Sequence, residues 1–257
     1  MNYLNDIDSK NCVGKIFKSL NSGDFKILKY NNSKNVEIQF LKTGYCKVAE
    51  MKEVRSGSIK DPHVSSVHGV GILGTKYPSS ISGRNTKEYN LWKRMLERCY
   101  SDVYKKKYPT YEGCEVSDKF KSYTYFYEWC NKQIGFDNEG WQLDKDLLVK
   151  GNKVYSENTC VLLPQEINKV LTKREASRGE HLIGVSWSDT SKSFIARVRK
   201  NKGKQERLGC FNTEIEAFNA YKTAKEAFIK EQAEKWKSQI DIRAYEALMK
   251  YEVNIND

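Results

Sequence analysis

The sequence has only three histidines, His63, His68 and His181, among 257 residues. This scarcity leaves few candidates for any mechanism that needs a histidine base. The seven cysteines form no Cys-x-x-Cys pair, so a zinc knuckle or zinc ribbon is not expected. Because the cysteines are odd in number and dispersed, we expect buried or half-buried thiols of a reducing compartment, without a disulfide framework.

Long apolar runs are also missing. No stretch approaches the roughly 18 apolar residues that a transmembrane helix needs. The N-terminal segment MNYLNDIDSK lacks the basic start and the apolar core of a signal peptide. We therefore expect a cytoplasmic protein that is not secreted and has no membrane partner.

Positive charge is abundant, since the formal net charge is +11. A hydrophobic content of 39% and an aromatic content of 12% are typical of a folded chain. Strongly basic proteins favour polyanionic partners, chiefly nucleic acid. Charge alone does not distinguish a nucleic-acid-binding protein from a soluble basic protein that has no such partner.

The first sixty residues predict a small all-β module. Short β-prone runs separated by Asn, Ser and Gly turn signals cover residues 13–18, 25–30, 36–40 and 45–49. Four or five strands in this length predict an SH3-like β-barrel, which would bind a partner protein and which has no catalytic feature. Residues 61–82 are rich in Gly and Ser and are interpreted as a connector.

Residues 83–173 are predicted to form a second domain. Apolar side chains at three- and four-residue spacing predict amphipathic helices over residues 87–100 and 120–133. The stretch 141–171 then predicts a strand, a loop with a Gly-Asn turn, a second strand over residues 159–163 and a helix opened by Pro164. We expect the two helices to support this ββα unit.

Two carboxylates in the ββα unit, Asp144 and Asp146, and the helix residue Asn168 are candidate functional groups. Carboxylate and amide oxygens suit Mg²⁺, so Asp144 and Asn168 could supply a metal site. Strand alternation predicts that Asp146 shares the face of Asp144. In the alternative interpretation the aspartates form ion pairs with nearby Lys or Arg, and Asn168 faces solvent.

Residues 174–257 predict a third domain. Strands are expected over residues 184–187, 193–200 and 207–211, followed by a helix over 214–236 capped by Thr213 and a short helix within 241–251. Alternation turns Phe194, Ala196 and Val198 towards the helix, and Ile195, Arg197 and Arg199 to the opposite face.

The predicted three-stranded sheet is strongly basic. Seven Lys or Arg residues and one acid lie between residues 192 and 207. A twisted β-ribbon can enter a major groove, and arginines reach guanine edges or phosphates. The predicted DNA-binding residues are Lys192, Arg197, Arg199, Lys202, Lys204 and Arg207.

A family resemblance covers residues 181–232. The segments Gly184-Val185, 194–199, 208–211 and Glu216-Ala217 resemble the plant ethylene-response-factor DNA-binding domain, which also occurs in phage proteins and homing endonucleases. The resemblance implies that the sheet enters the major groove and that Arg197, Arg199 and Arg207 contact DNA. Ser186 and Ser188 stand where the plant domains often carry base-contacting arginines, so the base preference does not transfer.

The ββα stretch is similar to the HNH endonuclease motif of phage and intron proteins. The resemblance rests on the order Asp144-Lys145, a Gly-Asn loop, Asn158, Pro164 and Asn168. It implies Mg²⁺ or Mn²⁺ held by Asp144 and Asn168, and an orienting asparagine, either Asn158 or Asn152. The implied catalytic residues are Asp144, Lys145 and Asn158.

Lys145 occupies the position at which the HNH family has its histidine base. As a cation a lysine can clamp phosphate, but it accepts protons poorly near neutral pH. Two interpretations therefore stay open for this α+β chain. One is a homing-endonuclease-like hydrolase of a phage or mobile element that cuts or nicks double-stranded DNA in a bacterial cytoplasm. The other is an inactive phage DNA-binding protein with a regulatory or counter-defence role.

Overall fold

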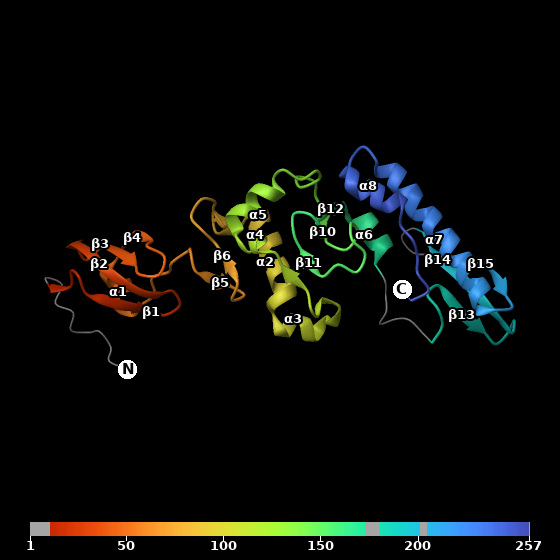
Figure 1. The fold of residues 1–257 in the computed structure, drawn as a ribbon, viewed down its shortest axis with the longest axis horizontal. Helices are drawn as coiled ribbons and strands as arrows, with labels where there is room; N and C mark the ends of the chain where they lie inside the picture. The colour runs from red at the N-terminus through yellow and green to blue at the C-terminus, as the bar shows by residue number, and fades with distance from the viewer. Residues whose placement is uncertain (1–10, 173–179, 201–204, 257) are drawn as a thin grey trace. The chain divides into compact units, whose positions relative to one another are not determined.

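The computed structural model describes residues 11–172, 180–200 and 205–256 (Figure 1). The fold is mixed α and β with several small sheets, which confirms the predicted α+β class. The chain divides into two compact units. The first comprises Met1–Cys130 with Lys153–Ser156, and the second comprises Asn131–Asn152 with Glu157–Asp257. The predicted domain boundaries at residues 60, 82 and 173 stay a prediction, because the two units do not divide the chain at these residues.

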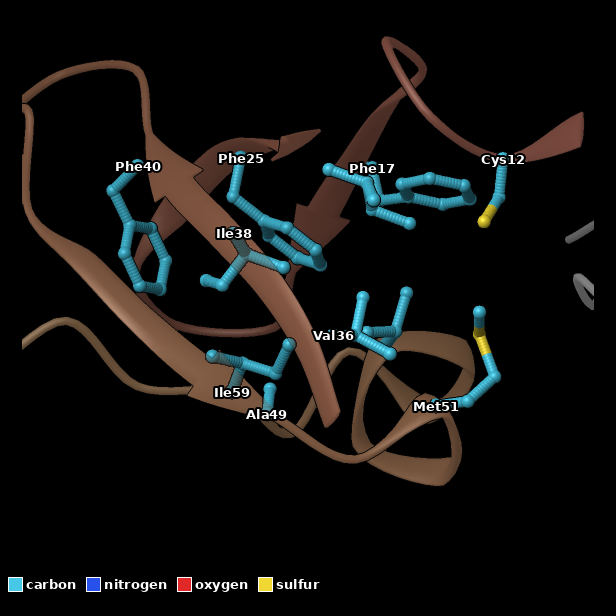
Figure 2. Packing of buried hydrophobic residues seen from close by; sticks show 11 residues of the cluster. Cys12, Phe17, Phe25, Val36, Ile38, Phe40, Ala49, Met51 and Ile59 are labelled. Atoms are coloured by element: carbon cyan, nitrogen blue, oxygen red, sulfur yellow. The ribbon is translucent and has the colours of Figure 1, made fainter. Parts of the chain in front are cut away.

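The first unit begins with a four-stranded antiparallel sheet in the order β1-β2-β3-β4. Its elements are β1 (Ile16–Ser19), β2 (Gly23–Asn32), β3 (Asn35–Phe40) and β4 (Cys46–Ala49), followed by α1 (Met51–Ser56). Strict alternation along β3 buries Val36, Ile38 and Phe40. Figure 2 shows these side chains in one apolar cluster with Phe25 and with Met51 of α1.

The strands of this module agree with the predicted β-rich segment, but they do not close. Within the described residues β1 and β4 are the two edges of an open sheet, and there is no closed barrel. α1 and the segment that follows it cover the inner face in place of further strands. Ile59 belongs to this core, and the Ser19 hydroxyl donates to the Ile59 carbonyl at 2.6 Å.

The remainder of the first unit is built on an aromatic helix pair. Its elements are β5 (Ser65–Val67), β6 (Gly71–Ile72), β7 (Ser80–Ile81), β8 (Arg84–Asn85), α2 (Lys87–Tyr100), α3 (Asp102–Lys107), η2 (Pro109–Tyr111), β9 (Glu115–Val116), α4 (Asp118–Lys121), α5 (Tyr123–Cys130) and β11 (Val154–Tyr155). Helix α2 has the predicted bounds. The single helix predicted over residues 120–133 is wrong, because extended backbone at Ser122 and its bridge to Ile72 divide α4 from α5.

The second unit contains the ββα stretch and the basic sheet. Its elements are β10 (Trp141–Asp144), β12 (Val161–Pro164), α6 (Gln165–Leu171), β13 (Val185–Ser188), β14 (Ser193–Arg199), β15 (Gln205–Phe211), α7 (Glu214–Trp236) and α8 (Ile242–Met249). Strands β10 and β12 are antiparallel, and β13-β14-β15 form a second antiparallel sheet. The elements follow the order strand, loop, strand, helix predicted for residues 141–171 and the order of three strands, a long helix and a short helix predicted after residue 184.

Helix α7 organises the second unit. Thr213 and Glu216 form a capping box, which fixes the helix start where the sequence predicts it. Towards its N-terminus, Phe218 and Tyr221 pack with Val198 of the basic sheet. Towards its C-terminus, Ile229 and Ala233 share a core with β12, α6 and α8. One helix therefore carries both the ββα stretch and the sheet.

Two global expectations can be compared with the described residues. Five of the seven cysteines are buried, whereas Cys46 and Cys210 are exposed. Among the helices of the described ranges, none combines the length and the apolar character required to cross a bilayer.

Candidate functional site

The outward face of β13-β14-β15 presents arginines from two neighbouring strands. Arg197 on β14 lies directly opposite Arg207 on β15, and Arg199 lies opposite Gln205. A register shift between Ala196 and Arg197 marks a bulge just before this basic part of the strand. The strands thus concentrate positive charge at one end of the sheet.

Side-chain hydrogen bonds hold two of these arginines, one across neighbouring strands and one along β15. Arg197 Nη1 donates to Ser186 Oγ on β13 at 2.6 Å, and Arg207 Nη2 donates to the Cys210 thiol on β15. Both guanidinium groups are held on the sheet face before any ligand arrives. Such preorganisation reduces the side-chain entropy that binding would otherwise cost.

A buried isoleucine lies at the centre of the same face. Ile195 has Ser186 and Cys210 as its cross-strand neighbours, and these are the two residues to which Arg197 and Arg207 donate. Although alternation predicts an outward position, Ile195 is only 5% exposed. The face therefore has an apolar centre with guanidinium groups bonded to the residues on either side of it.

Of the four remaining predicted DNA-binding residues, two are described by the structure and both are exposed. Arg199 is exposed at the end of β14. Lys192 lies in the β13–β14 turn with a φ of 46°, exposed and 3.6 Å from the Asp189 carboxylate. Lys202 and Lys204 lie outside the described residues.

The opposite face of the sheet is anchored on α7 by Gly184. This glycine has a φ of 79°, and a Cβ at its position would lie 2.1 Å from the Tyr221 ring. Only a residue without a side chain allows the strand to start this close to the helix. Val198, on the same strand as the arginines, packs against this helix as predicted.

Cys210 is a polar element of the basic face that the sequence pattern did not single out. The hydrogen bond from Arg207 lowers the pKa of its exposed thiol. Ser186 was likewise noted only as a departure from the plant pattern. The role of Ser186 depends on the strand register and that of Cys210 on the bulge in β15, and alternation within a single strand determines neither.

In the ββα stretch, the helix asparagine reaches the strand that carries Asp144. Asn168 Nδ2 donates to Gln142 Oε1 at 2.7 Å. Gln142 and Asp144 are alternate residues of β10 and so share a face of the strand. The structure thus brings Asn168 to the face of Asp144, with Gln142 beside it. Gln142 was missed, although its position two residues before Asp144 could have indicated it.

Asp144 closes the turn that follows β10. Its Oδ1 accepts the backbone N–H groups of Asp146 at 3.0 Å and of Leu147 at 2.8 Å. Because β10 ends at Asp144, strand alternation does not extend to Asp146, and that prediction is wrong. Burial raises the pKa of Asp144, and the nearby charge of Asp146 raises it further.

Lys145 is a structural cation of the loop. The residue is 7% exposed, and its ammonium donates to the Asp146 carboxylate and to the Asn152 carbonyl, the latter at 2.9 Å. Asn152 Nδ2 returns a 2.8 Å bond to the Lys145 carbonyl. Of the two candidate orienting asparagines, Asn152 is the one bonded to Lys145, whereas Asn158 lies exposed in the turn before β12.

Asp144 and Asn168 carry oxygens of the kind that Mg²⁺ binds. Asp144 Oδ2 and Asn168 Oδ1 take no part in the hydrogen bonds just described. Mg²⁺ keeps several waters and takes its other ligands from one or two carboxylates and from substrate phosphates, so two oxygens suffice. In the described ranges no three His, Cys, Asp or Glu side chains gather in a form suited to a metal. The donor set therefore differs from that of a structural zinc site.

His181, the one histidine of the second unit, is engaged elsewhere. Its Nδ1 lies 3.3 Å from Glu214 Oε1 at the start of α7, and its ring packs edge-on against Phe194. Both contacts lie at the basic sheet and the start of α7, and neither involves Asp144 or Asp146.

Comparison with known proteins gives no match. No protein-family model, no curated protein and no solved structure matches the chain.

Proposed function

We propose that this protein binds double-stranded DNA through the outward face of β13-β14-β15 and that its ββα stretch cleaves or nicks the bound DNA. The observation that carries the proposal is the preorganised arginine pair Arg197 and Arg207, held by Ser186 and Cys210 on one sheet face. Arg199 extends the same positive surface.

The sheet face has the chemistry that phosphate and base edges require. Guanidinium groups donate in a fork that matches phosphate oxygens and the O6 and N7 atoms of guanine. Ser186 accepts from Arg197 and so orients the arginine, while its own O–H remains a donor. The ethylene-response-factor resemblance supports the same face, and target sequence is left open.

The ββα stretch supports the nuclease half of the proposal less directly. A bound Mg²⁺ or Mn²⁺ would supply Lewis-acid stabilisation of charge on the phosphate. Asp144 and Asn168 would hold the ion, and Gln142 would orient Asn168 through their hydrogen bond. Lys145, which donates to Asp146 and Asn152, holds the loop and is not placed to take a proton from water.

The alternative is an inactive DNA-binding protein of a phage, with a regulatory or counter-defence role. The observation in its favour is the engagement of Lys145 with its own loop, where an HNH nuclease has a histidine base. We also propose that the N-terminal module binds a partner protein. The two open edges of its sheet support this role.

Binding is tested by the salt dependence of duplex affinity. Each lost phosphate contact reduces the slope of log K against log salt by about 0.9, so Arg197→Ala with Arg207→Ala should reduce it by about 2. The matched control removes two exposed lysines elsewhere in the second unit, Lys230→Ala with Lys250→Ala. Equal slopes for the wild type and the arginine variant, or no duplex affinity in the wild type, would overturn the proposal.

Cleavage is tested on supercoiled plasmid with Mg²⁺ or Mn²⁺. The nuclease interpretation predicts nicked or linear product, which Asp144→Asn and Asn168→Ala should abolish while duplex affinity stays intact. Asp146→Asn is the matched carboxylate control and should retain cleavage. Binding without cleavage in either metal would establish the inactive alternative.

A further inference from the structure

A short basic helix in the first unit has no role in its core. Helix α3 (Asp102–Lys107) buries none of its residues, and Val103 is 80% exposed. Aromatic contacts order the segment, since the Tyr104 ring packs 4.8 Å from Tyr108 and 5.6 Å from Tyr111. The Tyr111 ring in turn has the Arg98 guanidinium of α2 at 5.6 Å from its centre. The helix is thus fixed to the molecule while its outer side chains remain accessible.

The segment from Val103 to Tyr111 contains three consecutive lysines and no acidic residue. Lys105 lies 3.5 Å from Asp102, a partner one turn before it. Lys106 and Lys107 are exposed, and within the described residues neither forms an ion pair. Lys107 Nζ instead lies 5.4 Å from the centre of the Tyr108 ring.

Folding explains only part of this concentration of charge, because a cation near a helix C-terminus interacts favourably with the helix dipole. Consecutive helical residues point about 100° apart, so a single acidic side chain cannot neutralise all three lysines. Like charges this close repel one another, and a polyanion would relieve the repulsion.

Nucleic acid fits the chemistry of this surface. Lysine ammonium groups act as point charges towards phosphate. Tyr108 is 41% exposed beside Lys107, and a tyrosine hydroxyl can donate to phosphate oxygens of a duplex. The tyrosines pack on one another and do not form an apolar face that would enter a bilayer.

We infer that Lys106 and Lys107, with Tyr108, form a second DNA-contacting surface that binds the phosphate backbone. This inference rests on the proposed function, because it adds a DNA contact in the first unit to the DNA contact proposed for the second unit. The lysine surface supplies affinity without base recognition, since phosphate contacts position a protein but carry no sequence information.

The test compares Lys106→Ala with Lys107→Ala, as a double variant, with the wild type on duplex DNA. The salt slope should fall by about 2, and affinity should fall by a similar factor on duplexes of unrelated sequence. The control is Lys42→Ala with Lys60→Ala, which removes equal charge from exposed positions of the same unit and should leave the slope unchanged.

The outcomes separate the two proposals. If the wild type binds duplex and the lysine variant keeps its slope, the lysine surface is refuted and the sheet proposal stands. If the wild type binds no duplex, the proposed function fails, and this inference fails with it. Wild-type binding to phosphatidylserine vesicles that the lysine variant loses, with an unchanged DNA slope, would refute the inference in favour of a membrane surface.

Discussion

Lys145→Met tests whether Lys145 holds the loop of the ββα stretch. Methionine keeps the apolar stem and deletes the ammonium, which donates to Asp146 and to the Asn152 carbonyl. The Asp146 side chain is 56% exposed and would remain hydrated, so its loss of a partner costs little. The half-buried Asn152 carbonyl would lose a charge-assisted bond, which costs about 1–2 kcal/mol.

Native-state hydrogen exchange is the suitable assay, because it measures the free energy of local opening. Backbone amides of residues 145–152 should lose about 1–2 kcal/mol of protection in Lys145→Met. Lys169→Met replaces an exposed lysine on α6 and should change protection by less than about 0.5 kcal/mol. Unchanged protection in Lys145→Met would refute the structural role and return Lys145 to the candidates for catalysis.

Two further predictions concern α7. Burial lowers the pKa of Lys225 from 10.5 to about 8. Between about pH 8 and 10.5 Lys225 is therefore protonated in the unfolded chain but largely neutral in the folded protein, so the free energy of unfolding rises with pH. Lys225→Met should raise stability below pH 8 by at most about 3 kcal/mol and abolish that rise in denaturant titrations; an unaltered pH profile would contradict the assignment. Gly184→Ala would combine a φ of 79° with a clash against Tyr221. It should lower the melting temperature and the DNA affinity together, whereas Gly151→Ala, where no atom lies within 4 Å of the added Cβ, should cost only the backbone strain and leave DNA affinity intact.

Local signals determined much of the fold. The Thr213 and Glu216 capping box fixed the start of α7, and apolar periodicity gave the bounds of α2. The open N-terminal sheet was not foreseen, because strand propensity does not say whether the first strand meets the last. The division between α4 and α5 depends on the bridge from Ser122 to Ile72, a contact 50 residues distant in sequence.

The candidate sites were predicted to different depths. Alternation along β14 was enough to place Arg197 and Arg199 on one face. The hydrogen bond from Arg197 to Ser186 depends on the strand register, and the bond from Arg207 to Cys210 along β15 lies at the bulge; the sequence displays neither feature. Similarly, the order of polar residues suggested Asp144 and Asn168, but only the structure shows that Gln142 connects the helix to the strand.

Disulfide cross-linking to DNA tests the central claim most directly, because the protein carries two exposed cysteines in different places. Cys210 lies on the basic sheet face beside Arg207, which lowers the pKa of its thiol and so favours the reactive thiolate, and Cys46 lies on β4 of the N-terminal module. Duplex DNA carrying a thiol tether on the major-groove side of a base should attach to Cys210, and Cys210→Ser should abolish the product while Cys46→Ser retains it. Attachment through Cys46, or no attachment at Cys210 under conditions in which the duplex is bound, would show that DNA does not lie on this sheet.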